Sequence, residues 1–146
     1  MKNEKIYSPE APGAVGSYPH ARRVGPLLFL SGIGPRMRDG KGIPGLKLDT
    51  YGNFLEFDFE AQVHSVFRNV RTVLEASGAQ WEDLVDITVF LVNMKRDFTV
   101  FNRIYAEYFG ENQPCRTTVE IMSLPTPIAI ELKCIAYINE TSAPDA

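Results

Sequence analysis

The chain has 146 residues and a formal net charge of −3, with 45% hydrophobic and 23% charged residues. This size fits one domain with a real hydrophobic core, and the composition is that of an ordinary globular protein. The weak negative charge without a basic block argues against nucleic-acid binding, and no apolar run approaches the roughly 18 residues that a membrane span needs. The charged residues 1–5 have no apolar segment behind them, so we expect no secretory signal and a cytoplasmic location.

Five strands and two helices are predicted, and the first two strands form a hairpin. Residues 21–24 and 27–31 are the strands, and Gly25-Pro26 is the tight turn between them. Residues 32–56 are rich in Gly, Pro, Asp and basic residues, which predicts a long loop. Loops of this length in compact domains are often functional.

Apolar residues at spacings of three and four predict a first helix from about Phe59 to Leu74. Asp58 is placed to cap its start, and Ser77-Gly78 is placed to end it. Residues 85–92 alternate and are β-branched, which predicts the next strand.

A second helix follows, and one of its faces is aromatic: Phe98, Phe101, Tyr105, Tyr108 and Phe109. Asp97 is the expected cap of this helix, and Gly110 is its expected end. The last two strands are predicted at residues 117–122 and 128–137, on either side of a proline-rich turn. A polar tail begins at Asn139.

Two amphipathic helices need one sheet face to cover, which predicts an α+β sandwich with both helices on one side of a mixed sheet. We expect residues 1–146 to form this single domain. The last strand is apolar on both sides, so the face without helices should be a subunit interface. The apolar residues are Ile130, Leu132 and Cys134 on one side, and Ala129, Ile135 and Tyr137 on the other.

Two charged residues, Arg116 and Glu131, interrupt the last two strands, which otherwise indicate buried positions. Burying a charge costs several kcal/mol unless it is paired or faces a cleft, so charges on neighbouring strands predict a pocket. Arg116 can hold a carboxylate through two parallel hydrogen bonds. Glu131 can activate water if burial raises its pKa. The alternatives are an ion pair of Arg116 with Glu120 or Glu131, and a solvated Glu131 at a sheet edge.

Other candidates have equally ordinary explanations. Tyr18 could cover a ligand or pack as a loop aromatic, and Asn102 could orient a polar group or lie on a helix surface. His20 and His64 lack the spacing of a metal pair, so no metal site is predicted. Phosphate-loop, dinucleotide and nucleophile-elbow motifs are absent from the sequence.

Taken together, these residues match a known family. From about residue 8 to 137, the chain resembles the reactive-intermediate deaminase family (Rid, or YjgF-like). Each matching piece is short, but their order and spacing together are specific. The pieces are Ala11-Pro12, Gly16-Ser17-Tyr18, Phe29-Leu30-Ser31-Gly32, Ala61-Gln62, Asn69-Val70, Thr88-Val89-Phe90-Leu91, Asn102 with Tyr105, and residues 114–131.

The resemblance implies a chorismate-mutase-like α+β domain that assembles as a homotrimer with clefts between subunits. It also implies hydrolysis of 2-imino or enamine acids to 2-keto acids and ammonia, without metal or cofactor. Arg116 would bind the substrate's carboxylate, and Glu131 would position and activate the water. The residues lining the same cleft would be Tyr18, Ser31, Gly32, Asn102 and Thr118. Thr118 stands where many members have Cys, which excludes a thiol role here.

Two departures from the common pattern bear on the substrate. Pro19-His20 follows Tyr18 where a Gln-containing run is usual, and the loop at residues 35–57 is longer than in broad-specificity members. This loop, with Ile43-Pro44-Gly45, resembles the 2-aminomuconate deaminase subgroup, whose dicarboxylate enamine substrate arises in the breakdown of aromatic compounds. The expected reaction is therefore 2-aminomuconate to 4-oxalocrotonate (2-oxohex-3-enedioate).

A dicarboxylate needs a second cation near the cleft. We expect Arg36 and Arg38 to supply it. The other cations available are Lys41, Lys47, His20, Arg22 and Arg23. Two alternatives to this function stay open: a broad 2-iminobutanoate or 2-iminopropanoate deaminase, and a non-enzymatic trimer that binds ligands or acts like a chaperone.

Overall fold

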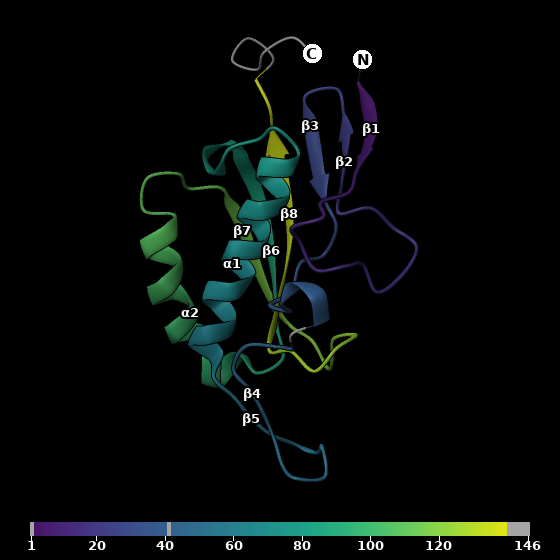
Figure 1. The fold of residues 1–146 in the computed structure, drawn as a ribbon. Coiled ribbons are helices and arrows are strands. Elements are labelled where there is room, and N and C mark those ends of the chain that lie inside the picture. The colour runs from purple at the N-terminus through teal and green to yellow at the C-terminus, as the bar shows by residue number, and fades with distance from the viewer. Residues whose placement is uncertain (1, 41, 140–146) are drawn as a thin grey trace.

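A computed structural model describes residues 2–40 and 42–139 as an α+β fold (Figure 1). One sheet of six strands has the order β1-β2-β3-β8-β6-β7, and both long helices cover the same face of it. The pair β6–β7 is parallel and the other pairs are antiparallel, so the sheet is mixed as predicted. Its strands are β1 (Asn3–Ile6), β2 (Ala21–Val24), β3 (Leu27–Leu30), β6 (Leu84–Leu91), β7 (Cys115–Glu120) and β8 (Ile130–Tyr137).

Helix α1 (Phe59–Ala76) begins and ends where the sequence predicts. The Asp58 side chain accepts a hydrogen bond from the Ala61 amide at 3.2 Å, which satisfies one of the unpaired amides of the first turn. Ser77 ends the helix, and Gly78 follows with a φ of 75° that glycine adopts without strain. The apolar face of α1 packs on the sheet and forms much of the core.

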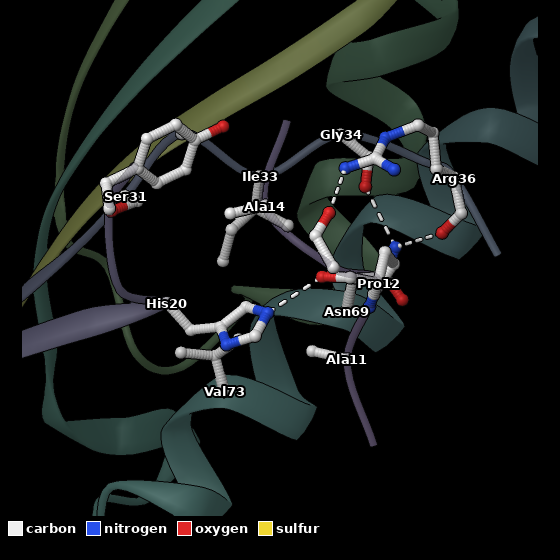
Figure 2. Close-up of a pocket in the computed structure, with 13 residues that line it drawn as sticks. Ala11, Pro12, Ala14, His20, Ser31, Ile33, Gly34, Arg36, Asn69 and Val73 are labelled. Carbon is white, nitrogen blue, oxygen red and sulfur yellow. Dashed lines mark hydrogen bonds between the residues drawn. The ribbon is translucent and has the colours of Figure 1, made fainter. Parts of the chain in front are cut away.

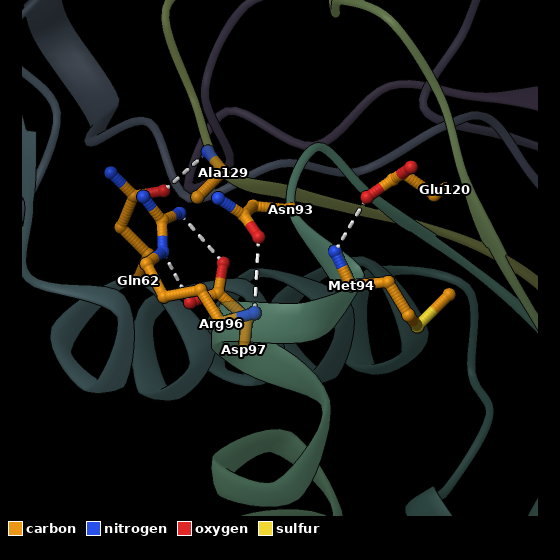
Figure 3. Close-up of polar contacts among 7 residues, drawn as sticks. All are labelled: Gln62, Asn93, Met94, Arg96, Asp97, Glu120 and Ala129. Carbon is orange, nitrogen blue, oxygen red and sulfur yellow. Dashed lines mark hydrogen bonds and ion pairs between the residues drawn. The ribbon is translucent and has the colours of Figure 1, made fainter.

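Helix α2 (Met94–Tyr108) begins earlier than predicted, and its cap is Asn93. Asn93 Oδ1 accepts from the Arg96 amide at 3.0 Å (Figure 3). Asp97 lies inside the first turn, almost fully buried, and both its oxygens bind Arg96 at 2.7 Å. The prediction that Asp97 caps this helix is therefore wrong, because an acidic residue favours the first turn as well as the cap position.

The predicted long loop contains further structure. β4 (Leu46–Leu48) and β5 (Phe54–Phe57) form a separate hairpin that projects from one end of the sheet (Figure 1). Its turn is closed by Asp49, whose carboxylate accepts from the amides of Tyr51 and Asn53 at 2.8 Å. Two short 3₁₀ helices, η1 (Arg38–Gly40) and η2 (Trp81–Asp83), complete the described elements.

The face of β8 away from the helices differs from the prediction. Ile130, Leu132 and Cys134 are buried beneath the helices as expected. The opposite face is polar as well as apolar, since Glu131 and Lys133 alternate with Ile135 and Tyr137 there, and Ala129 is fully buried. The last strand is therefore not apolar on both sides, and its role as a subunit interface stays a prediction.

No helix in residues 2–40 and 42–139 combines the length and the apolar character that crossing a membrane requires. Lys41 and residues 140–146, which include most of the predicted polar tail, lie outside the described residues.

Candidate functional site

Arg116 and Glu131 lie on opposite faces of the sheet. Strand β6 separates their strands, with Arg116 beside Ile87 and Glu131 beside Phe90. Positions 87 and 90 of one strand point to opposite sides, and so do their partners. The expectation that neighbouring strands bring both charges to one pocket is wrong within a single chain. The connection between β6 and β7 passes through α2, which sets β7 at the sheet edge beyond β6.

Arg116 lies on the helix side of edge strand β7. Its guanidinium donates to Asn102 Oδ1 at 2.8 Å and lies 4.7 Å from the ring centre of Tyr105 and 5.4 Å from that of Phe101. Cation–π contacts and a neutral acceptor hold the group without neutralising it. Among the described residues, no ion pair joins Arg116 to Glu120 or Glu131, so its charge stays available to an anion.

Two buried hydroxyls beside Arg116 have no hydrogen-bond partner in the part of the chain that the structure describes. They belong to Thr118, two residues along the same strand face, and to Tyr105, whose ring lies against the guanidinium. Burial raises the pKa of Tyr105 to about 12, so its hydroxyl keeps its proton and can donate. Buried polar atoms are normally paired, so these orphans indicate a missing acceptor such as a carboxylate.

Tyr105 is a candidate site residue that the sequence places on an aromatic face and, with Asn102, among the pieces that match the family, without a predicted role in the site. The signal that could have found it is its spacing from Asn102. Residues three apart share one face of a helix, so both side chains reach the same point on β7. Asn102, Thr118 and Arg116 therefore come together as predicted, with Tyr105 as a fourth member.

Glu131 is half-buried on the other face, against the backbone of Gly32. A Cβ atom at Gly32 would lie 2.8 Å from Glu131 Oε2, so the absent side chain makes room for the carboxylate. Burial raises the pKa of Glu131, and the nearby Arg36 partly opposes this. Both line a pocket of about 540 Å³, part of it open to solvent, together with Tyr18 and Thr126.

Segment 8–20 borders this pocket and an adjoining one of about 400 Å³ (Figure 2). Tyr18 lines both, and its hydroxyl accepts from the Val15 amide at 3.3 Å. Ser31 Oγ donates to the Pro19 carbonyl at 2.7 Å. The structure thus brings the predicted residues Tyr18, Ser31 and Gly32 to the side of Glu131 rather than to that of Arg116.

The candidate cations differ in whether they line the Glu131 pocket. Arg36 lines the Glu131 pocket and donates to the Gly13 carbonyl at 2.8 Å. Arg38 pairs with the exposed Glu10 and is not among the residues that line this pocket, so only one of the two preferred cations is placed to meet a ligand there. Lys47 is also engaged elsewhere, with Glu56 of the β4–β5 hairpin.

A model of the endoribonuclease L-PSP family matches residues 8–138. A RutC family protein of Pyrococcus abyssi is 35% identical over 137 residues, covering 94% of this chain and 98% of that protein. The chain belongs to the Rid/YjgF/RutC family. Reactive Intermediate Deaminase A of Arabidopsis thaliana, a chloroplast protein, is 35% identical over 138 residues, covering 94% of this chain and 67% of that protein.

The solved structure of the YjgF gene product of E. coli has the same fold as this Rid-family chain. The two superpose with a TM-score of 0.79 at 29% sequence identity, over 93% of this chain and 99% of that one. The predicted family and the α+β fold class are both confirmed, whereas the 2-aminomuconate deaminase subgroup and the homotrimer stay predictions.

Proposed function

We propose that this Rid-family chain hydrolyses an enamine or imine acid to a 2-oxo acid and ammonia without a cofactor. The observation that carries the proposal is a pair of half-sites with complementary chemistry. One is an unneutralised Arg116 with orphaned hydroxyls from Tyr105 and Thr118, which suits a carboxylate. The other is the half-buried Glu131 in a pocket, which suits a general base. The name of the Arabidopsis relative supports the same chemistry.

The two half-sites belong to adjacent subunits in this proposal. They lie on opposite faces of one sheet, so a single chain cannot use both on one small substrate. β7 is an edge strand with Cys115 and Val119 exposed, so a second copy can approach Arg116 from there with its own Glu131 pocket. A closed ring of such contacts repeats the site at every interface, and we propose a homotrimer.

In the proposed mechanism, the enamine first takes a proton at carbon and becomes an iminium ion whose C2 is electrophilic. Arg116, Tyr105 and Thr118 hold the C1 carboxylate and fix the orientation of C2. Glu131 of the adjacent subunit takes a proton from water as the water oxygen bonds to C2, which forms a carbinolamine. The nitrogen receives a proton, the C–N bond breaks, and the hydroxyl loses its proton, leaving ketone and ammonia. General-base catalysis of this kind contributes about 10²–10⁴-fold.

The substrate that we propose is the dicarboxylate 2-aminomuconate, with 4-oxalocrotonate as the product. Arg36 supports this choice because it lines the Glu131 pocket, where the far carboxylate of such a substrate would reach. A guanidinium binds a carboxylate with directional, charge-assisted hydrogen bonds. A monocarboxylate imine would leave Arg36 without a partner in the substrate.

The test is ammonia release from 2-aminomuconate and from 2-iminobutanoate by the purified protein and by Arg116→Ala. We expect Arg116→Ala to lower kcat/KM by about 10²-fold or more, since it removes a charged substrate contact. Arg68→Ala, an exposed arginine of α1, is the matched control and should keep the wild-type rate. Unchanged turnover in Arg116→Ala would refute the role of this residue. Faster turnover of 2-iminobutanoate would favour the broad-specificity alternative, and binding without turnover would favour the non-enzymatic one.

A further inference from the structure

One imidazole ties together two points of segment 8–20, which carries Tyr18 past the Glu131 pocket. His20 Nδ1 lies 2.9 Å from the amide nitrogen of Ser8. His20 Nε2 lies 2.7 Å from the carbonyl oxygen of Pro12, a contact that Figure 2 shows. Both contacts are partly buried, so water competes for them only weakly.

The two partners determine which nitrogen of His20 carries the proton. A backbone amide can only donate, so Nδ1 must be the unprotonated acceptor towards Ser8. A carbonyl oxygen can only accept, so Nε2 must carry the hydrogen that Pro12 receives. An imidazolium has hydrogens on both nitrogens, and its Nδ1 hydrogen would point at the Ser8 amide hydrogen. Protonation therefore replaces the Ser8 contact by a repulsion.

The surroundings of His20 add to this effect. Arg36, from the segment after β3, is the charged residue among those lining the adjoining pocket, so an imidazolium would add a second positive charge there. Helix α1 contributes only uncharged residues to this pocket, Asn69 and Val73, and Tyr18 is the remaining titratable group. On segment 8–20 itself, Glu10 is paired with Arg38.

The Ser8 contact matters because the other fastenings hold other residues: the His20 amide donates to the Ile6 carbonyl, and Arg38 pairs with the exposed Glu10. Arg36 holds the Gly13 carbonyl, and Ser31 holds the Pro19 carbonyl through its hydroxyl and the His20 carbonyl through its amide. Losing the Ser8 contact would leave the start of the segment held by the Pro12 contact of His20 and by the exposed Glu10–Arg38 ion pair, and the backbone around Ser8 would open more readily. We infer that the position of Tyr18 would loosen with it.

We propose that His20 is a positioning residue that holds segment 8–20 beside the site only while its ring is neutral, so substrate binding weakens in acid. The kinetic part rests on the proposed function, whereas the structural part does not. The test spans the range from about pH 5 to 8, in which histidine side chains in general change charge.

Three variants test the proposal. His20→Gln offers one acceptor and one donor but does not titrate, and His20→Ala removes both contacts. His64→Gln is the matched control, because His64 binds the Tyr108 hydroxyl between the two helices and not segment 8–20. The readouts are amide hydrogen exchange of residues 8–20 and KM for 2-aminomuconate, each at about pH 8 and about pH 5.5.

We expect wild type and His20→Gln to show equal exchange and equal KM at the higher pH. At the lower pH, segment 8–20 of the wild type should exchange about two- to tenfold faster than that of His20→Gln at the same pH, as the loss of one hydrogen bond predicts. KM of the wild type should rise by a similar factor, and His64→Gln should follow the wild type. Segment 8–20 of His20→Ala should exchange fast at both pH values.

Identical exchange of wild type and His20→Gln in acid would overturn the proposal, as would nitrogen NMR shifts that place the neutral proton on Nδ1. The pH effect on exchange without any deamination would refute the proposed function and leave the positioning role standing. If deamination occurs and the ratio of wild-type KM to His20→Gln KM is the same at both pH values, the proposed function stands and the positioning role of His20 is refuted.

Discussion

Glu131 lies between two opposing influences on its charge. Burial against Gly32 disfavours the carboxylate and raises its pKa, and the cation of Arg36 in the same pocket lowers it again. A general base works only when it is deprotonated, so in the proposed mechanism the balance of these two influences would set the acid limit of activity. Arg36 would thus tune the base as well as bind substrate.

Arg36→Gln removes the cation, so the pKa of Glu131 should rise further above its ordinary value. The carboxylate would then protonate at a higher pH, and the acid limb of the kcat/KM profile should move to higher pH. Profiles of wild type, Arg36→Gln and Arg68→Gln check this, with the last expected to match wild type. A limb that stays in place, or moves to lower pH, would show that Glu131 is not the titrating base.

Gly32→Ala tests the close packing around the same carboxylate. The new Cβ would overlap Glu131 Oε2, and the flexible carboxylate would move away because the backbone cannot. We expect kcat to fall by about tenfold or more, since a misplaced catalytic group is costly, while the thermal midpoint changes little. Thermal unfolding and steady-state kinetics measure the two effects. A large loss of stability with normal kcat would mean that Gly32 serves the fold alone.

The helices and strands show how local signals succeed or fail. α1 carries both a cap and a regular apolar face, so periodicity locates it closely. β1 reads Asn-Glu-Lys-Ile and is mostly exposed, so no alternation reveals it; only its pairing with β2 makes it a strand. The β4–β5 hairpin also lacks a strand signal in the sequence, because it lies in a glycine-rich stretch that predicts a loop.

Asn93→Ala should destabilise the protein by about 1 kcal/mol, because it removes the hydrogen bond that caps α2. Asn93→Asp keeps an acceptor and should stay within a few tenths of a kcal/mol of wild type. Urea unfolding measures both variants. Equal stability of Asn93→Ala and wild type would mean that Asn93 contributes nothing as a cap.

At the scale of the whole molecule, the strand order decides what one chain can do. The order β8-β6-β7, with Arg116 beside Ile87 and Glu131 beside Phe90, places the proposed carboxylate-binding half-site on the helix side and the proposed water-activating half-site on the other. A subunit alone then holds two incomplete sites. Assembly is therefore part of the proposed catalysis and not only of stability.

Mixed assemblies test this directly. Arg116→Ala and Glu131→Gln should each be inactive, but co-assembled in equal amounts they should recover about a quarter of the wild-type rate, because each site takes one half from each of two neighbours. Co-expression with two different tags, followed by an ammonia assay, gives the measurement. Mixed assemblies as inactive as the parents would place both residues in one subunit's site and refute the shared arrangement.

The sequence by itself determined the chemical groups and those local elements that have a regular apolar pattern. Residue types at short spacings indicate the candidate residues Arg116 and Glu131, the first helix with its caps, and the family. These signals can be read from the sequence because they depend on residues that are close together in the chain. Only the tertiary structure decided that β6 separates β7 from β8, in a register that puts the two charges on opposite faces. It also decided that Arg36 rather than Arg38 reaches Glu131, and that Tyr105 joins Arg116. Strand pairing and loop paths depend on contacts between residues far apart in the chain, and local spacing carries no record of them.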